Sequence, residues 1–344
     1  MLICMLEEAF TVNSEPHPSL HNKKCKKLVK KAERALAELY QKLENGKVPI
    51  LVDFNQVMIA SVSVAAGIPN TELNPDMIRH LFLNSVVSYK KKFGEKYGEI
   101  VICCDAGNNW RKRVYAYYKA KRAQGRAESP LDWKMIFETL SMIHDEIDEF
   151  FPYKVIRVDG AEGDDVIAVL AKYFQDNEYT YRGLEEERQS VLIISSDRDF
   201  IQLQEFGNVS QWTPMFKKMI TEANPREYRF AKIISGDVGD GVPNIFSDDD
   251  TLVTEGKRQK PATEKRVKPV MDALLAGLPV PPDVEVNFDR NKKMIDLVDL
   301  ACPQDIVDAI IERYKTANQA PRGQLLNYFM KFRLKNLSKD IDKF

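Results

Sequence analysis

Residues 191–203 read VLIISSDRDFIQL: four β-forming apolar residues, two serines, and then two acids that flank an arginine, Asp197 and Asp199. A short apolar run without alternation is typical of a strand that is buried on both faces. An acid that follows such a strand has two common explanations. It can cap the next helix, or it can hold a functional position at the edge of the sheet.

The same pattern occurs three more times. Apolar runs lead to acids in 48–54 (VPILVDF), 98–107 (GEIVICCDAG) and 153–160 (YKVIRVDG), with helical composition in 75–94 and 164–174. Strands that alternate with helical segments predict an α/β fold, with a mainly parallel central sheet flanked by helices. Strand signals fade near residue 220, and mostly helical patterns follow. We therefore expect a leader with a basic helix in 1–47, an α/β domain in 48–222 and a smaller helical domain in 223–344.

The composition describes an ordinary globular protein. The 344 residues are 44% hydrophobic and 29% charged, with a formal net charge of −1. No apolar stretch approaches the roughly 20 residues needed to cross a bilayer. Five scattered cysteines without a CxxC pair indicate a reducing compartment, and neither a disulfide framework nor a zinc site. We expect a monomer in the cytoplasm, or in the host cytoplasm if the protein is viral, with no membrane partner.

Three acids stand at the carboxyl ends of predicted strands: Asp53, Asp105 and Asp197. In open α/β sheets, ligands bind at that edge. Each acid taken alone is also explained as the cap of the following helix. Because carboxyl ends of parallel strands meet at one edge, the three together favour a functional site.

Two more acidic groups join this edge. In GAEGDDVIAVL, Glu162 and Asp165 are three residues apart at the start of a helix and share one face, while Asp164 points to one side. In SGDVGDGVPN, Asp237 and Asp240 are again three apart. Simpler explanations are the helix dipole, which favours acids in a first turn, and a turn rich in Asp and Gly.

Converging carboxylates repel one another and require bound cations. A ligand set of oxygens without His or Cys favours Mg²⁺, with Mn²⁺ as a substitute, over zinc. Two such ions would clamp the attacking and leaving oxygens of a phosphodiester. The candidate metal ligands are Asp53, Asp105, Glu162, Asp164, Asp165, Asp197, Asp199, Asp237 and Asp240.

A basic segment follows Asp105. From Ala106 to Ala127 there are seven Lys and Arg residues and no acid, interleaved with one Trp and three Tyr. Cations neutralise phosphates and aromatic faces accept unstacked bases, so this mixture suits single-stranded nucleic acid. The alternative is a solvated amphipathic helix. The candidate nucleic-acid-binding residues are Arg111, Lys112, Arg113, Tyr117, Tyr118, Lys119, Lys121, Arg122 and Arg126.

Six motifs, in order from about Val48 to Phe344, resemble the flap endonuclease (5′-nuclease) superfamily, and especially its T-even phage ribonuclease H branch. They are LVDFNQ, IRHLFLNSV, WRKRVYAYYKAKR, VLIISSDRDFIQL, QWTPMFKK and PRGQLLNYFMKF. The resemblance implies a PIN-like 5′-nuclease core, a helical arch at 111–129 and a DNA-binding helical domain in 223–344. It carries the family's metal-binding acids onto seven of the nine candidates, with Asp164 and Asp237 matching less regular members of the set. Gly241 stands where the family often has Asn.

The resemblance implies a 5′-3′ exonuclease and flap endonuclease that uses two Mg²⁺ ions. Its substrates would be RNA–DNA hybrids and flapped or nicked DNA duplexes, and its role the removal of RNA primers in DNA replication. The expected catalytic residues are the metal-binding Asp53, Asp105 and Asp197, together with Arg111 and Lys119 beside the scissile phosphate. One rival is a non-catalytic nucleic-acid-binding replication factor, against which the intact acid set argues. A second rival, a haloacid dehalogenase phosphatase, needs an acid where this chain has Asn55.

The N-terminal stretch MLICMLEEAF is an apolar cluster ahead of a polar segment. Such a cluster on a tether could fill a pocket on another protein. By the family resemblance, the expected partners are the replication sliding clamp and the single-stranded-DNA-binding protein. Met5, Leu6 and Phe10 are the candidate docking residues, with Phe10 as the anchor. The alternative is that this leader packs on the basic helix at 23–45.

Overall fold

The computed structural model describes residues 49–68, 73–176, 190–317 and 319–344. The predicted basic helix and the docking residues Met5, Leu6 and Phe10 lie outside the described residues. No helix in the described ranges is long and apolar enough to span a bilayer.

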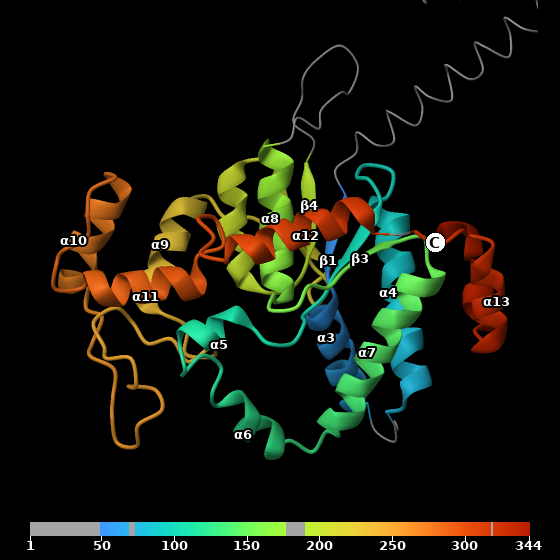
Figure 1. The fold of residues 1–344 in the computed structure, drawn as a ribbon, viewed down its shortest axis with the longest axis horizontal. Helices are drawn as coiled ribbons and strands as arrows, with labels where there is room; N and C mark the ends of the chain where they lie inside the picture. Colours follow the sequence, from blue (N-terminus) through green and yellow to red (C-terminus); the bar gives the residue numbers. More distant parts are fainter. Residues whose placement is uncertain (1–48, 69–72, 177–189, 318) are drawn as a thin grey trace, which may run out of the picture. The chain divides into compact units, whose positions relative to one another are not determined.

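Six strands form one sheet in the order β3-β2-β1-β4-β5-β6 (Figure 1). They span Ile50–Asp53 (β1), Ile100–Cys103 (β2), Lys154–Ile156 (β3), Val191–Ile194 (β4), Val209–Thr213 (β5) and Lys218–Ile220 (β6). Neighbours pair in parallel except β5 and β6, which are antiparallel. The predicted mainly parallel sheet is confirmed, and the four apolar runs form β1 to β4.

Alternate residues of β1 to β4 enter two different cores. In β1, Ile50 and Val52 pack with α3 (Phe54–Ala66), α4 (Pro75–Phe93) and α7 (Trp133–Phe150). Leu51 faces the opposite core, which contains α8 (Gly163–Asp176) and α12 (Gln304–Thr316). Burial on both faces explains why these strands are continuous apolar runs.

The region after the sheet is helical. Its helices are α9 (Pro225–Ser235), α10 (Glu264–Leu275), α11 (Glu285–Ile295), α12, α13 (Gln324–Lys331) and α14 (Lys335–Ser338), followed by the 3-10 helix η3 (Ile341–Lys343). Residues 47–344 form one compact unit, in which α12 packs on α8 and β3, and α13 packs on α7. The sheet ends at Ile220, and the later helices share its cores, while the domain boundary at 222/223 stays a prediction.

The capping explanation holds for two of the strand-end acids. Asp53 caps α3, with Oδ1 accepting from the Gln56 backbone N–H at 3.0 Å. Asp197 caps the 3-10 helix η2 (Arg198–Phe206), with Oδ1 accepting from Asp199 N–H at 2.9 Å. A cap uses one carboxylate oxygen and fixes the side chain, so the second oxygen keeps a defined direction.

Candidate active site

The carboxyl ends of β1, β2 and β4 point toward the lower edge of the sheet in Figure 1, and the chain passes below them through α5 (Trp110–Val114) and α6 (Arg122–Ala127) to α7. The segment predicted as a helical arch at 111–129 thus contains two short helices. Asp105 follows β2, and its Oδ1 accepts from the backbone N–H of Gly163 at 2.7 Å. Its own N–H donates to Asn55 Oδ1 at 3.2 Å, which ties the ends of β1 and β2 together.

Asp53 is the most enclosed of the strand-end acids, with 5% exposure. Its Oδ2 accepts from the Ser195 hydroxyl at 2.8 Å. Burial raises the pKa of Asp53 to about 7, and the negative charges of Asp105 and Asp197 add to the rise. A cation bound nearby would therefore favour the ionised form of Asp53.

The adjacent residues Asp164 and Asp165, at the start of α8, have opposite surroundings. Burial, followed by the charges of Asp197 and Asp53, holds the pKa of Asp164 well above its usual range. Asp165 is fully buried, and its Oδ2 accepts from Trp110 Nε1 at 3.2 Å, from Arg111 at 2.9 Å and from Glu162 N–H at 2.9 Å. Asp164 is therefore the acid oriented toward the strand-end carboxylates, and Asp165 holds the interior. This reverses the emphasis that the helical spacing suggested.

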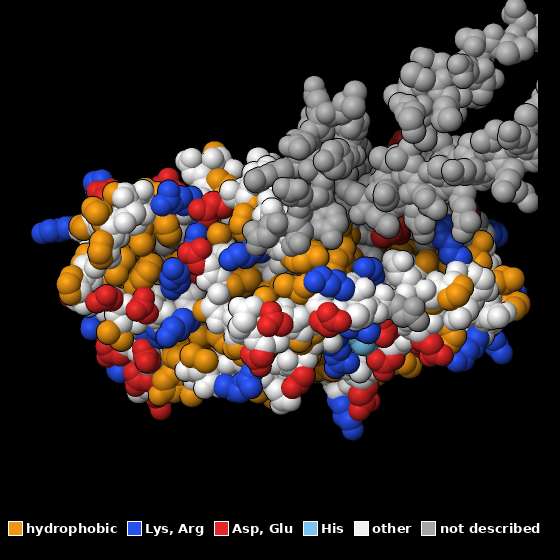
Figure 2. Space-filling model, turned by 45° about the horizontal axis from the view of Figure 1, so that its top comes forward, with side chains coloured by type: hydrophobic (Ala, Val, Ile, Leu, Met, Phe, Trp, Pro, Cys, Tyr) orange, Lys and Arg blue, Asp and Glu red, His pale blue; other side chains and the backbone are white. Residues whose placement is uncertain are grey.

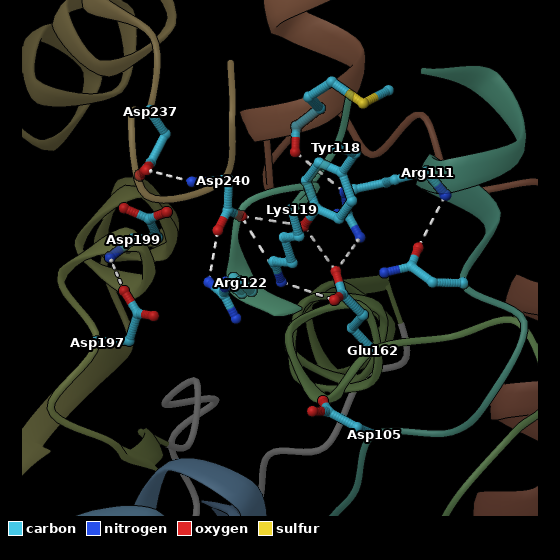
Figure 3. Close-up of polar contacts among 12 residues, drawn as sticks. Asp105, Arg111, Tyr118, Lys119, Arg122, Glu162, Asp197, Asp199, Asp237 and Asp240 are labelled. Carbon is cyan, nitrogen blue, oxygen red and sulfur yellow. Dashed lines mark hydrogen bonds and ion pairs between the residues drawn. The ribbon is translucent and has the colours of Figure 1, made fainter. Parts of the chain in front are cut away.

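Glu162 stands among cations that come from the arch segment (Figure 3). Lys119 Nζ lies 2.6 Å from Glu162 Oε1 and 3.6 Å from Asp240 Oδ2, so it bridges the two acids. The Tyr118 hydroxyl lies 2.7 Å from Glu162 Oε2, and Arg122 contacts Asp240 Oδ1 at 2.6 Å. Although burial alone would raise it, the positive charges of Lys119 and Arg111 lower the pKa of Glu162 to about 2.

Backbone geometry aims Lys119 at this acid. Lys119 has a φ of 55°, a conformation that costs a non-glycine residue of order 1–3 kcal/mol. Its N–H donates to the Asp240 backbone carbonyl at 2.8 Å, which holds the strained turn in place. Gly241, at φ 76°, faces the same turn, and a Cβ there would lie 2.5 Å from the Tyr117 carbonyl oxygen. The close approach accounts for glycine where the family often has Asn.

Lys232 on α9 is a site residue that the sequence analysis missed. Its Nζ bridges Asp199 Oδ1 at 2.7 Å and Asp237 Oδ2 at 2.9 Å. Burial, followed by the charge of Asp197, raises the pKa of Asp199 to about 6 in spite of this ammonium group. Lys232 follows the helical pattern of α9 without a distinguishing motif, so only the fold brings it to the acids.

The structure corrects the expected contact between Arg111 and the scissile phosphate. Arg111 is 2% exposed, and its guanidinium donates to the Met294 carbonyl at 3.0 Å as well as to Glu162 and Asp165. These partners engage the Nε, Nη1 and Nη2 groups of the buried guanidinium. Arg111 instead pairs the buried acids of α8 and so positions Glu162.

The expected role of the arch aromatics as base-stacking faces is also wrong for most of them. Trp110, Tyr115 and Tyr118 are 2%, 6% and 3% exposed and belong to the core. Tyr117 is half-buried, edge-on to Tyr115 at 5.6 Å between ring centroids. The arch segment is therefore anchored by its aromatics and presents its cations.

Those cations line a pocket of about 760 Å³ beside Asp105 and Glu162. Lys112, Arg113, Lys119, Arg122 and Arg126 contribute to its walls. By contrast, positive and negative side chains are intermixed over the face drawn in Figure 2. The pocket thus combines concentrated positive charge with the carboxylate edge, as phosphate recognition next to a metal site requires. Lys121 is exposed and is not part of the pocket lining.

The side chains fit divalent cations bound by oxygen. In the described ranges, no three His, Cys, Asp or Glu side chains are close enough to one another to bind one metal ion in their present conformations. Lysine ammonium groups bridge two acid pairs instead. Burial, and after it the charges of neighbouring acids, raises the pKa values of Asp53 and Asp164. A donor set of carboxylates alone suits a hard cation such as Mg²⁺ or Mn²⁺.

Two family models together cover the chain from Asp53 onward. Residues 53–231 match the N-terminal resolvase-like domain of 5′-3′ exonucleases, and residues 226–344 match the C-terminal domain of T4 RNase H. The chain belongs to the 5′-3′ exonuclease family. Ribonuclease H of Enterobacteria phage T4 is 34% identical over 304 residues, which cover 86% of this chain and 95% of the relative. The family and the branch that the motifs indicated are confirmed, and this family member is a nuclease.

More distant relatives agree in fold. A 5′-3′ exonuclease of Buchnera aphidicola subsp. Schizaphis graminum is 25% identical over 57% of this chain and 64% of its own length. The T5 5′-exonuclease structure with divalent metal ions (zinc) matches with a TM-score of 0.55 and 19% identity, over 79% of this chain and 100% of that chain. A T5 flap endonuclease complex with DNA and metal ions matches with a TM-score of 0.55 and 18% identity over the same shares.

Proposed function

We propose that this family member is a 5′-3′ exonuclease and flap endonuclease that requires two Mg²⁺ ions, which Mn²⁺ can replace. One observation carries the proposal. At one edge of the sheet, acids from β1, α8 and the end of β4 that have no ion-pair partner among the described residues lie next to a cationic pocket. Asp53, Asp105, Asp164 and Asp197 would hold one ion, and Asp199, Asp237 and Asp240 the second. When bound, the ions would supply an activated water and neutralise the leaving oxygen.

The side chains around the acids have separate tasks. Ser195 and Gln56 N–H fix the Asp53 carboxylate, and Gly163 N–H fixes Asp105. Lys119 and Arg122 stand next to the acids with partly exposed cationic groups, so each can transfer its contact from a carboxylate to the scissile phosphate. There they would stabilise charge that develops on the phosphate oxygens. Arg111 and Asp165 support this edge from the interior.

The substrates we propose are RNA–DNA hybrids and flapped or nicked DNA duplexes, and the role is primer removal during replication in the cytoplasm of a phage host. The 34% identity with phage T4 ribonuclease H supports this assignment. A 5′-labelled flap duplex and an RNA-primed duplex test it. Short 5′ products should appear with Mg²⁺ and disappear with a chelator. Tight binding without cleavage at any Mg²⁺ or Mn²⁺ concentration would favour the non-catalytic replication factor instead.

We also propose that the leader docks on the sliding clamp through Met5, Leu6 and Phe10, and that the single-stranded-DNA-binding protein is a second partner. The basis is the apolar cluster at the start of the chain. Deletion of residues 1–10 should leave cleavage of naked DNA unchanged and remove stimulation by the clamp. Stimulation that survives the deletion, or a loss of thermal stability, would contradict the docking role.

A further inference from the structure

A second pocket, of about 280 Å³, lies on the other side of Asp105, between α3 and α7. Its walls are chemically unlike those of the cationic pocket. The exposed Phe137 gives it apolar surface, backed by the buried Phe54 and Leu140, and Ser141, His144 and Arg157 give it polar groups. Apolar walls with a few polar groups are the usual lining of a site for a small organic ring.

The two pockets share one rim. Asp105, Ala106 and Gly107 line both of them. If the phosphates of a nucleic-acid strand bind in the cationic pocket, a base of that strand would therefore lie next to this shared rim. The distance between a phosphate and its own base is short, so neighbouring pockets of these two kinds suit adjoining parts of one nucleotide.

Phe137 is the unusual residue of this pocket. The core-facing residues of α7 include Ile136, Leu140 and Ile143, which are 0–4% exposed, whereas Phe137 is 44% exposed. Single exposed aromatics are common on protein surfaces and need no special explanation. Phe137, however, lines a pocket that reaches the catalytic edge, and two further contacts surround its ring.

Those contacts form a stacking platform. The Trp133 ring lies 5.7 Å from the Phe137 ring between centroids, at an interplanar angle of 31°. The Arg126 guanidinium lies 5.6 Å from the Phe137 centroid and also lines the cationic pocket. Aromatic faces flanked by cations are the usual means of holding an unpaired strand, because every base has a face that can stack.

We propose that the pocket between α3 and α7 is a nucleobase subsite, which takes the base of the unpaired nucleotide next to the cleaved phosphodiester, with Phe137 as its stacking face. The proposal rests on the nuclease function and assigns a recognition role to residues outside the carboxylates and the basic arch. Stacking is insensitive to base identity, so the subsite selects an unpaired nucleotide and not a sequence. A base still held in a duplex cannot enter a pocket of this kind.

Abasic substitution tests the subsite. A set of 5′-flap substrates each carries one tetrahydrofuran abasic site, moved nucleotide by nucleotide across the cleavage position. For the unmodified chain, one position should lower kcat/KM by roughly 5- to 100-fold, the range expected for a lost base stack. Phe137→Ala should lower kcat/KM on the intact substrate by a similar factor and show no further loss at that position. Phe137→Trp should restore both properties.

Phe216→Ala is the matched control, because Phe216 is also an exposed aromatic, at 68%, in the turn between β5 and β6. It should keep the full sensitivity to the abasic site. The subsite is overturned if the Phe137→Ala and abasic effects multiply, if no position is sensitive, or if Phe137→Ala cleaves like the unmodified chain. A melting temperature measured for each variant separates loss of folding from loss of stacking.

A second measurement needs no cleavage. With 2-aminopurine moved nucleotide by nucleotide across the flap junction and a chelator present, binding should change its fluorescence at one position for the unmodified chain and for Phe216→Ala, but not for Phe137→Ala. If all variants give the same change, the subsite is wrong while the nuclease function stands. If no substrate is cleaved with Mg²⁺ yet this fluorescence difference appears at one position, the nuclease function fails, while binding of an unpaired base by this pocket stands.

Discussion

The two sides of the carboxylate cluster differ in what neutralises their charge. On one side, Lys119, Arg122 and Lys232 contact Glu162, Asp240, Asp199 and Asp237. On the other side, among the described residues, no Lys or Arg forms an ion pair with Asp53, Asp164 or Asp197. The pKa of Glu162 is lowered to about 2, while that of Asp53 is raised to about 7.

This difference predicts that the two sides bind metal ions with different affinities. Ionisation of Asp53 and Asp164 is disfavoured unless a cation from solution binds there, so we expect this side to bind the tighter ion. The side with Asp199 and Asp237 carries an ammonium group that an ion must displace, so we expect its ion to bind more weakly. On the side of Glu162 and Asp240, Lys119 would exchange its contact with Glu162 for one with the substrate phosphate.

The largest effect should come from the two neighbouring acids of α8. Asp164→Asn should abolish cleavage and leave the melting temperature of the metal-free protein equal or higher, because the substitution removes a repelled charge. Asp165→Asn should instead destabilise the fold, by roughly 3–5 kcal/mol if it leaves the buried Arg111 charge without its partner. Cleavage assays and thermal unfolding of both variants measure this contrast. Near-normal cleavage by Asp164→Asn would show that the wrong acid has been assigned.

Lys119→Ala should slow cleavage by roughly 10²–10³-fold, as expected for loss of one donor to a transition-state oxygen. Substrate binding without metal should change much less. Lys112→Ala is a matched control, because Lys112 is exposed in the same pocket and is not in contact with the acids. Single-turnover rates at saturating enzyme give the comparison. Equal losses for the two variants would make Lys119 a backbone anchor.

The pH dependence of metal stabilisation should reveal the acids whose pKa values are raised by burial and by neighbouring acids. The folded-state pKa values of Asp53 and Asp199, about 7 and about 6, exceed the ordinary value of 3.8. Their stabilising contribution is therefore complete below about pH 4 and is lost as the pH rises through these values. Glu162 has the opposite shift, to about 2, so its contribution is constant above about pH 4.5.

The metal-free protein should consequently become less stable between about pH 5 and pH 8, and Mg²⁺ should raise its melting temperature more at pH 8 than at pH 5.5. Differential scanning calorimetry at both pH values measures the two increases. Asp53→Asn should reduce the difference between them. Equal increases in melting temperature at both pH values would mean that Asp53 and Asp199 do not coordinate the ions.

The smallest predicted effect concerns the outer wall of the cationic pocket. Arg113→Ala should weaken binding of all substrates by a similar small factor and reduce the slope of log affinity against log salt by about one unit. Arg113 lines the pocket and is exposed, away from the acids. Binding titrations over a range of salt concentrations provide the slope. A specific loss for flapped substrates alone would point to a role beyond phosphate contact.

Much of the fold was predictable because buried strands have a strong local pattern. The apolar runs ending in acids located β1 to β4, since strands covered on both faces need apolar residues at every position. β6 has no such pattern, because it is an edge strand of three half-exposed and exposed residues held by backbone pairing with β5.

The side-chain roles were less predictable, because composition does not specify burial. Trp110, Tyr115 and Tyr118 looked like nucleic-acid contacts, yet they anchor the arch in the core. Helical spacing could group Glu162 with Asp165 but could not show that their shared face meets Arg111. Phe137 lies on a helix with a clear apolar face, and only the three-dimensional position of Asp105 makes it notable.

Anomalous diffraction from crystals soaked in Mn²⁺ tests most directly whether the acids at the strand ends bind the catalytic ions. We predict a strong peak within coordination distance of Asp53 and Asp164, on the side without protein cations. A weaker peak should lie beside Asp199 and Asp237, with Lys232 displaced from both. A peak at Asp165, or no peak at this edge in crystals whose protein cleaves DNA with Mn²⁺, would contradict the assignment.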